Sequence, residues 1–481
     1  FITCRLHLRL MSRSTYENVI SPPPAIKGNC IMFKYLKYSA TPTAALLSTL
    51  TAWLIALTPV ACQTAAPVVP PSAPAPPSAP APALTPTATP ATATPRAELQ
   101  EHRSWTFATT APAVTFDNQF PCARVNRCEE IAPHDYRITI TPENDPINPS
   151  PWYAFRVRAD APTDITVRFV IATKTVRPRP RLSTDGTHWT RVTDAQWTGA
   201  SGAPECVLRM HAEPAATWVA SNDIIGNDRL AAWSDALAVR TGATVEAFGT
   251  SAGGRALRMF TLSANANTPE DWVIVIGRQH PPEVSGSVGL MAFMDEITSE
   301  SARARAFRGA FRVALVPVVN PDGVHEGQWR STLGGVDSNR DWGAFTQPEI
   351  MALRDAILAI RSRPGARVWL AVDFHGTNKD ILYTPLADDR TFPPRFASQW
   401  VAAIQARFPD YEVESTSAHN ATEWTFKRWA YETLGAPGIT YELGSSTPHA
   451  QIQRIVTGAA DEAMRLLMDA KTANAHTPPD A

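Results

Sequence analysis

Alternating apolar and polar positions dominate the chain from residue 98 to residue 214. Side chains along a strand point to opposite faces in turn, so this period predicts strands with one buried face. The clearest apolar sets are Tyr136, Ile138 and Ile140, and then Ile165, Val167, Phe169 and Ile171. Asp185 and Gly186 form a pair that is typical of a tight turn between strands. These features predict a small antiparallel β-sandwich domain over residues 98–218.

From residue 222 onward the apolar period lengthens to that of a helix. Apolar residues share one helical face at Ile350, Leu353, Ile357 and Ile360, and again at Phe396, Trp400, Ile404 and Phe408, and a last helix is expected over 449–468. Between the helices lie the β-rich runs "WVIVIG", "FRVALVPVV", "RVWLAVDF" and "GITYEL". Buried strands that alternate with amphipathic helices predict an α/β domain over 222–470, with a mixed, largely parallel central sheet flanked by helices. Residues 471–481 are expected to form a flexible tail.

Upstream of both domains the composition changes. Residues 32–62 carry lysines, an apolar run and then Cys62, a pattern that resembles a bacterial lipoprotein signal peptide starting at Met32. Residues 1–31 would then be a doubtful upstream segment. We expect export to the periplasm or the outer membrane, with Cys62 as a lipid anchor; a single membrane anchor is disfavoured because the apolar run is short for a span. Residues 63–97, rich in Pro, Ala and Thr, predict a disordered tether.

Charge and cysteine content exclude several classes of function. The chain has 44 Lys and Arg against 45 Asp and Glu, which argues against a nucleic-acid partner or a polybasic membrane contact. None of the six cysteines forms a Cys-x-x-Cys pair, so a thiolate zinc site is disfavoured. In an oxidising compartment Cys122 and Cys128 could form a disulfide, which would leave Cys206 unpaired. These patterns do not indicate an oligomeric state.

Candidate catalytic side chains follow the predicted strands. His280 and Glu283 come just after the first buried run, while His375 and Glu442 each end another. Ligand sites in α/β domains gather beyond the carboxyl ends of the strands. A His-x-x-Glu pair alone is a weak signal, but two imidazoles and a carboxylate are the donors that hydrolytic zinc takes while it keeps one position open. The sequence therefore predicts one Zn²⁺ per chain, held by His280, Glu283 and His375.

Six short motifs occur in a recognisable order: "RQHPPE", "NPDGV", "QWR", "GVDSNRDWG", "DFHG" and "TYELG". From Asn222 to about Leu467 the chain resembles the zinc metallocarboxypeptidase family, carboxypeptidase A-like. The segment "PENDPINPSPWYAFRV" is similar to the β-sandwich domain that precedes the catalytic domain in the cytosolic-carboxypeptidase-like subfamily. The resemblance implies a hydrolase that cleaves the C-terminal peptide bond, or a related amide, of a substrate with a free carboxylate.

Roles follow from this resemblance, residue by residue. His280, Glu283 and His375 would bind zinc, and Glu442 would be the general base that takes a proton from a zinc-activated water and passes it to the leaving amine.

Four further residues match the family's motifs around the substrate. Arg330 would stabilise the oxyanion, and Asn339 with Arg340 would hold the terminal carboxylate, for which a guanidinium is well shaped. Asp337 would orient the first zinc histidine.

The family's tyrosine that covers the bound carboxylate has no clear equivalent. Phe426 stands where the motif suggests it, and the nearest hydroxyl is on Tyr431, so the role stays open. Lys427 and Arg428 are candidate electropositive specificity residues. An acidic C-terminal residue and a peptidoglycan stem peptide both remain candidate substrates.

Two other classes of function compete with this interpretation. "GTSAG" at 249–253 fits the nucleophile elbow of a serine esterase, with Ser251 as the nucleophile. An elbow requires a helix directly after the serine, whereas the following residues alternate like a strand. A non-catalytic module that binds peptides or cell-wall ends is disfavoured because Glu442 accompanies a complete ligand set.

Overall fold

The computed structural model describes residues 96–475, except 146, 149, 173–178, 200–202, 204, 387–389 and 419–421. The expected upstream segment, the signal peptide with Cys62 and nearly all of the tether lie outside the described residues, as do residues 476–481. The described residues belong to one compact unit. Within them, no helix combines the length and apolar character needed to cross a membrane.

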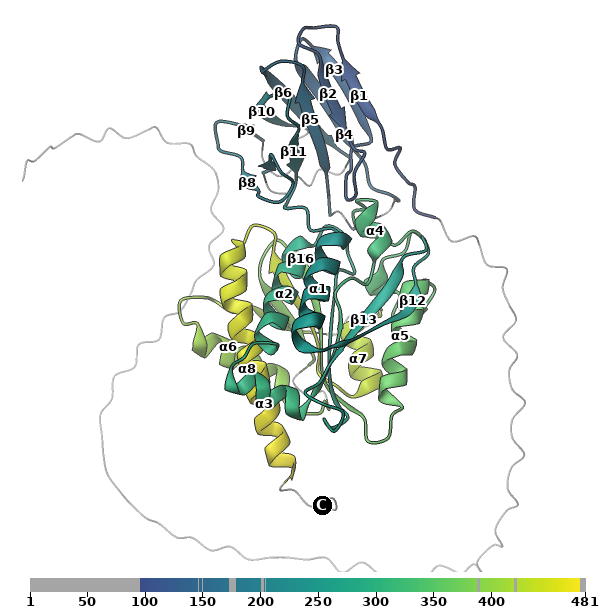
Figure 1. Cartoon of the computed structure of the whole chain (residues 1–481), viewed down its shortest axis with the longest axis vertical. Helices are drawn as coiled ribbons and strands as arrows, with labels where there is room; N and C mark the ends of the chain where they lie inside the picture. The colour runs from purple at the N-terminus through teal and green to yellow at the C-terminus, as the bar shows by residue number, and fades with distance from the viewer. Residues whose placement is uncertain are drawn as a thin grey trace, which may run out of the picture. The chain divides into compact units, whose positions relative to one another are not determined.

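Two sheets build the N-terminal domain (Figure 1). The first contains, in spatial order, β1 (Ser104–Phe107), β2 (Val114–Asp117), β5 (Ala154–Ala159), β11 (Thr217–Ala220), β7 (Arg181–Ser183) and β8 (Thr190–Arg191). The second contains β3 (Arg127–Ala132), β4 (Asp135–Ile140), β6 (Thr163–Ile171), β10 (Cys206–Ala212) and β9 (Trp197–Thr198). The sheets pack through aromatic contacts such as Phe116 with Tyr136, whose ring centroids lie 4.9 Å apart. The predicted β-sandwich is confirmed.

One strand pair of the sandwich departs from the antiparallel expectation. β4 and β6 run parallel, because the chain leaves β4, contributes β5 to the other sheet and only then returns. Every other pair in the two sheets is antiparallel.

The disulfide considered for Cys122 and Cys128 does not form, and both residues are free thiols. Cys128 packs into the core from β3, whereas Cys122 sits in a turn beside Gly226 of the following domain. Burial raises the pKa of Cys122 to about 11, so its thiol is protonated at neutral pH. Cys206 is also free and buried.

An eight-stranded mixed sheet forms the centre of the C-terminal domain. Its strands, in spatial order, are β12 (Thr244–Thr250), β13 (Ala256–Leu262), β15 (Arg312–Val316), β14 (Asp271–Gly277), β16 (Arg367–Thr377), β19 (Gly438–Gly444), β17 (Ile381–Thr384) and β18 (Ser415–Ser417). The central strands β15, β14, β16 and β19 are parallel to one another, and the flanking pairs β12/β13, β13/β15 and β17/β19 are antiparallel. The predicted mixed sheet is confirmed.

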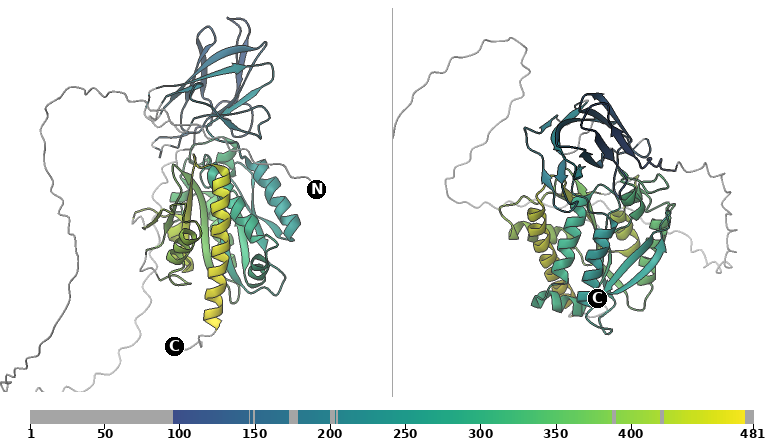
Figure 2. Two further views of the ribbon diagram at one scale, coloured as in Figure 1. Left: turned by 90° about the vertical axis from the view of Figure 1, so that its left-hand side faces the viewer. Right: turned by 45° about the horizontal axis from the view of Figure 1, so that its top comes forward.

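Helices cover both faces of this sheet (Figures 1 and 2). They are α1 (Asn227–Thr241), α2 (Val284–Ile297), α3 (Ala302–Ala310), α5 (Pro348–Arg361), α6 (Phe396–Arg407), α7 (Phe426–Leu434) and α8 (His449–Ala475), with the short α4 (Pro321–His325) and η1 (Ser338–Arg340). Along β14, Val273 and Val275 pack in one core with α2, α3, α6 and α8, while Ile274 and Ile276 pack in a second core with α5 and α7. A strand buried on both faces explains the unbroken apolar run in the sequence.

The helices predicted from periodicity agree with α5, α6 and α8. α8 continues through Ala475, so the first residues of the expected tail are helical. No helix follows the "GTSAG" segment, because residues 256–262 form β13.

Candidate active site

Three neighbouring parallel strands bring the predicted catalytic residues together. β14 pairs with β16, and β16 pairs with β19, so their carboxyl ends meet at one edge of the sheet. His375 and Glu442 are direct partners in the β16/β19 pair. His280 and Glu283 lie in the loop between β14 and α2. Residues that are up to 162 positions apart in the sequence therefore share one site.

α2 begins directly after Glu283, whose side chain makes no capping bond to the helix. That carboxylate instead accepts a hydrogen bond from the backbone N–H of Gly376 at 3.1 Å and faces both histidines. Gly286 allows this approach, because a Cβ there would lie 2.7 Å from the carbonyl oxygen of His375. The two prolines before Glu283 lie in a loop, as expected, and the helix starts only after Glu283.

The donor atoms of His280, Glu283 and His375 lie within 4.8 Å of one another. His280 Nδ1 is 2.9 Å from Glu283 Oε1, His375 Nδ1 is 2.8 Å from Glu283 Oε2, and the two Nδ1 atoms are 3.1 Å apart. Two nitrogens bound to one tetrahedral zinc at about 2.0 Å would be separated by about 3.3 Å. The residues present therefore fit a zinc ion.

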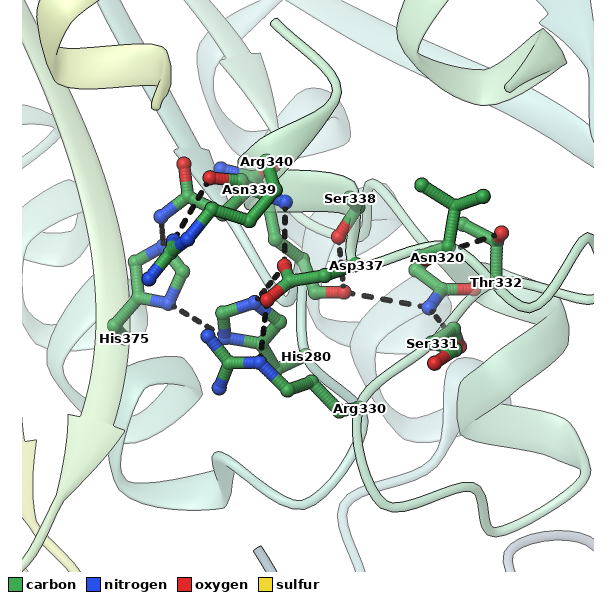
Figure 3. Close-up of polar contacts among 12 residues, drawn as sticks. His280, Asn320, Arg330, Ser331, Thr332, Asp337, Ser338, Asn339, Arg340 and His375 are labelled. Carbon is green, nitrogen blue, oxygen red and sulfur yellow. Dashed lines mark hydrogen bonds and ion pairs between the residues drawn. The ribbon is translucent and has the colours of Figure 1, made fainter. Parts of the chain in front are cut away.

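Each histidine is oriented by a second carboxylate on its other ring nitrogen, and Figure 3 shows this contact for His280 and Asp337. His280 Nε2 lies 2.9 Å from Asp337 Oδ1, and His375 Nε2 lies 2.6 Å from Asp373 Oδ2. This arrangement turns both Nδ1 atoms toward the shared centre, as metal-binding histidines require. Asp337 is the residue that the sequence motifs predict to orient His280. Asp373 was missed, although side chains two positions apart on a strand share a face, which places it beside His375.

Neighbouring charges shift the pKa values of Glu283 and His375 within the cluster. Burial raises the pKa of Glu283, but His280 and His375 outweigh it and hold that pKa well below its usual range. Burial lowers the pKa of His375, yet Asp373 and Glu283 together raise it well above the ordinary value. A carboxylate held so strongly ionised between two imidazoles favours a bound divalent cation.

Glu442 faces the same centre without joining the ligand set. Burial, followed by the charge of Glu283, raises its pKa to about 7, against the opposing effect of His375. A bound cation would lower this pKa, because positive charge favours the ionised carboxylate. Its buried Oε2 has no hydrogen-bond partner among the described residues. A carboxylate oxygen left without a protein partner at such a centre is available to water or substrate.

A cavity of about 510 Å³ opens in front of these groups. Its lining combines His280, Glu283 and Glu442 with the predicted substrate residues Arg330, Asn339 and Arg340, and with Tyr383, Thr425, Lys427 and Thr440. Asn148 and Ser150 of the sandwich domain complete one wall. A larger cavity of about 720 Å³ lies by α1 and β13 and contains none of the predicted site residues.

The predicted substrate residues lie on the loop between α4 and η1 and within η1 (Figure 3). Arg330 is nearly buried and donates through Nε to Asp337 Oδ2 at 2.5 Å. Its terminal nitrogens make no hydrogen bond within the described part of the chain, and the residue lines the cavity. Arg340 Nε pairs with Glu423 at 2.7 Å. Asn339 Nδ2 lies 3.3 Å from His375 Nε2, and Asn339 Oδ1 accepts the backbone N–H of Phe426.

The structure separates the candidates left open near α7. Phe426 is fully buried, with its ring against Trp342, and does not line the cavity. Tyr431 does not line it either, whereas Tyr383, on β17, does. Periodicity gave no signal for Tyr383, which lies far from the matched motif in sequence and reaches the site through the β17/β19 pairing.

The two candidate cations differ in position. Lys427 lines the cavity and donates through Nζ to the carbonyl oxygens of Thr384, at 3.2 Å, and Ala418. Arg428 lies outside the cavity, paired with Glu432 and stacked on Trp424. Of the two, Lys427 is therefore the one that can contact a ligand in the cavity.

Ser251 of the "GTSAG" segment has a structural role. Its hydroxyl donates to Asp322 Oδ1 at 2.9 Å and accepts the backbone N–H of Arg255 at 2.9 Å. Asp322 also binds the N–H of Gly253 and the Arg255 guanidinium, which closes the turn between β12 and β13. No histidine within the described residues bonds to Ser251, so the elements of an esterase site are not assembled there.

Two imidazoles and a carboxylate that converge at the edge of an α/β sheet form a donor set typical of metallohydrolase domains. Residues 230–461 match the family described as zinc carboxypeptidase, and the chain therefore carries a zinc carboxypeptidase domain. The recognition of this family from the sequence motifs is confirmed.

Curated relatives include cytosolic carboxypeptidases. The chain is 28% identical to cytosolic carboxypeptidase 6 of Mus musculus over 38% of this chain and 34% of that protein. It is 23% identical to cytosolic carboxypeptidase 2 of Danio rerio over 56% of this chain and 42% of that protein. The chain thus spans less than half the length of these relatives.

Solved structures share the fold over a longer range. A metallo-carboxypeptidase from Burkholderia cenocepacia superposes with a TM-score of 0.62 at 18% identity, covering 75% of this chain and 99% of that chain. A metallo-carboxypeptidase from Pseudomonas aeruginosa, in complex with (2-guanidinoethylmercapto)succinic acid, gives a TM-score of 0.59 at 18% identity, over 74% and 99% of the two chains.

Proposed function

We propose that this protein is a zinc-dependent metallocarboxypeptidase that hydrolyses the C-terminal peptide bond, or a related amide, of a substrate with a free carboxylate. The observation that carries the proposal is the ligand set of His280, Glu283 and His375 in one cavity with the free carboxylate of Glu442. The proposed activity predicts release of a single C-terminal residue from a peptide acid and none from the matching peptide amide. Equal cleavage of both peptides would contradict it.

Zinc held by His280, Glu283 and His375 would supply a Lewis acid that lowers the pKa of water and polarises a carbonyl. Glu442 accepts the proton of the attacking water and delivers it to the leaving amine, which requires an ionised carboxylate at the start of the cycle. Its unpartnered Oε2 supports this role. Asp337 and Asp373 keep the ring nitrogens of the two histidines directed at the centre.

Arg330 stabilises the negative charge that develops on the carbonyl oxygen. Its Nε is fixed by Asp337, so the terminal nitrogens have a defined direction before substrate arrives. Donors that need no reorganisation during the reaction are the ones that lower the barrier most.

Asn339 and Arg340 hold the substrate's terminal carboxylate. We expect Arg340→Ala to raise KM for a peptide acid roughly 10- to 100-fold, because a charged hydrogen-bonded contact contributes about 1.5–3 kcal/mol. Steady-state kinetics of the two enzymes measure this effect. Arg428→Ala, which removes a guanidinium outside the cavity, is the matched control and should keep KM unchanged. An unchanged KM in Arg340→Ala would remove Arg340 from this role.

The serine-hydrolase alternative predicts a different outcome for Ser251. We expect Ser251→Ala to retain full peptidase activity and to lose about 1–2 kcal/mol of unfolding free energy, since its buried hydroxyl bonds Asp322 and Arg255. Kinetics and thermal unfolding separate the two effects. Loss of activity in this variant, with normal zinc content, would favour the serine mechanism.

For the substrate, both an acidic C-terminal residue and a peptidoglycan stem peptide remain candidates. Lys427 at the cavity wall supports a preference for negative charge. Cleavage of a library with varied C-terminal residues, alongside purified cell-wall peptides, distinguishes the two. A library preference for large apolar residues would contradict both.

We also propose that the protein is exported and anchored through lipid at Cys62. The support is the sequence of residues 32–62 alone. Cell fractionation with labelled fatty acid tests it, and a soluble unlabelled protein in the cytoplasm would overturn it.

A further inference from the structure

Glu143 of the sandwich domain is bound to the loop that carries Arg330. The Glu143 side chain is buried, and its two oxygens accept three consecutive backbone N–H groups of the C-terminal domain. Oε2 accepts from Trp329 at 2.8 Å, and Oε1 accepts from Arg330 at 2.9 Å and from Ser331 at 2.8 Å. Successive N–H groups that converge on one anion fix the local backbone conformation.

Further hydrogen bonds join the sandwich domain to the same loop, which carries Arg330. Asn144 accepts the Ser331 hydroxyl at 3.0 Å and donates to the carbonyl oxygen of Gly335 at 3.0 Å. The Trp329 indole N–H donates to the carbonyl oxygen of Trp152 at 3.1 Å. The segment between β4 and β5 therefore holds the loop at several points.

Arg330 makes the middle one of the three bonds to Glu143, and it is also the residue that lines the cavity. Glu143 fixes the Arg330 backbone from one side, and Asp337 fixes its side chain at Nε from the other. Asp337 in turn contacts His280, so Arg330 is held in register with the zinc ligands. Glu143, Arg330 and His280 are buried and Asp337 is half-buried, so the guanidinium of Arg330 has few positions that it can adopt.

We propose that Glu143 is a positioning residue for the reaction, which acts by holding Arg330 where the oxyanion forms. The proposal rests on the proposed function, in which Arg330 contacts that oxyanion. It assigns to the sandwich domain an indirect part in catalysis, exerted through the backbone of the Arg330 loop.

A double-mutant cycle between Glu143→Gln and Arg330→Ala tests this role. Glutamine keeps the size of the side chain but replaces one accepting oxygen with an NH₂ donor, which cannot pair with all three N–H groups. We expect kcat of Glu143→Gln to fall about 10- to 100-fold with little change in KM, because misplacing a group that acts in the transition state affects turnover. Zinc content should stay at one per chain.

The double variant gives the decisive measurement. We expect Arg330→Ala alone to lose about 10²–10³-fold in kcat, and Glu143→Gln to reduce kcat by no more than about twofold further in that background. A residue that merely stabilised the fold would lower activity by the same factor in both backgrounds. A further loss of tenfold or more, including a fall below detection, would overturn the proposal.

Control variants distinguish a specific effect of Glu143 on Arg330 from a general weakening of the contact between the two domains. His102→Ala breaks a contact between the same two domains at Glu326, away from Arg330, and should leave kcat unchanged in both backgrounds. Asn144→Ala serves if Glu143→Gln does not fold, and it should lose several-fold in kcat only when Arg330 is present. Near-normal activity of Arg330→Ala would contradict the proposed function itself. If Glu143→Gln instead lowers kcat by the same factor with and without Arg330, only the role of Glu143 is contradicted.

Discussion

Glu442→Gln is expected to lower kcat by about 10²–10⁴-fold, the range that a positioned general acid–base group contributes, with zinc content unchanged. Glutamine keeps the size and shape of the side chain but cannot take up a proton at neutral pH. Glu442 does not belong to the cluster of metal donors, so its replacement leaves His280, Glu283 and His375 in place. Substrate should still bind, and KM should change much less than kcat.

The expected result for Glu442→Gln is a large loss of peptide hydrolysis while the zinc content stays the same. Steady-state kinetics on a peptide acid give kcat, and metal analysis of the purified variant gives the zinc content. Glu412→Gln, at an exposed position of the same domain, is the matched control and should behave as the unmodified enzyme. Near-normal turnover in Glu442→Gln would refute Glu442 as the base.

Removal of the metal is expected to abolish activity and to destabilise the C-terminal domain. His280, Glu283 and His375 are buried, and without a cation the charged carboxylate of Glu283 stays buried in their site. A ligand that binds only the folded state stabilises it by about 2.7 kcal/mol when its concentration is 100 times its Kd, so the melting temperature should fall on chelation. Added Zn²⁺ should restore both activity and melting temperature.

His375→Ala separates loss of the site from inhibition by the chelator. We expect this variant to bind zinc at least 10- to 100-fold more weakly than the unmodified protein, since it loses a direct ligand and not only an outer partner. Its activity should not recover at zinc concentrations that restore the chelated enzyme. Full activity of the chelated, metal-free protein would contradict a metallohydrolase, whatever the result for His375→Ala.

Local patterns predicted the elements well where one face or both faces of an element are buried. The apolar spacing of Ile350, Leu353, Ile357 and Ile360 matches the buried face of α5. The unbroken run 272–276 became the doubly buried strand β14. Alternation after Ser251 correctly predicted β13 and so argued against an esterase elbow. Periodicity succeeds here because burial acts on each element separately.

Contacts between distant segments were the ones missed. Tyr383 lines the cavity, yet it was assigned no role from its motif. The parallel β4/β6 pair and the free thiols of Cys122 and Cys128 also differ from the local expectation. In each case the outcome depends on which strand lies next to which, and that information is not carried by the spacing of neighbouring residues.

The sequence alone determined the two domain types and the family, and it predicted the zinc donors, because residue chemistry and motif order are properties of the linear chain. Only the tertiary structure decided that both Nδ1 atoms face one centre, that Lys427 but not Arg428 reaches the cavity, and that Glu143 holds the Arg330 loop. The pairing of β14, β16 and β19 places their carboxyl ends together. Close packing of the surrounding side chains then fixes the direction in which each side chain points. A metal site depends on those directions, so its chemistry can be predicted from residue types while its geometry requires the fold.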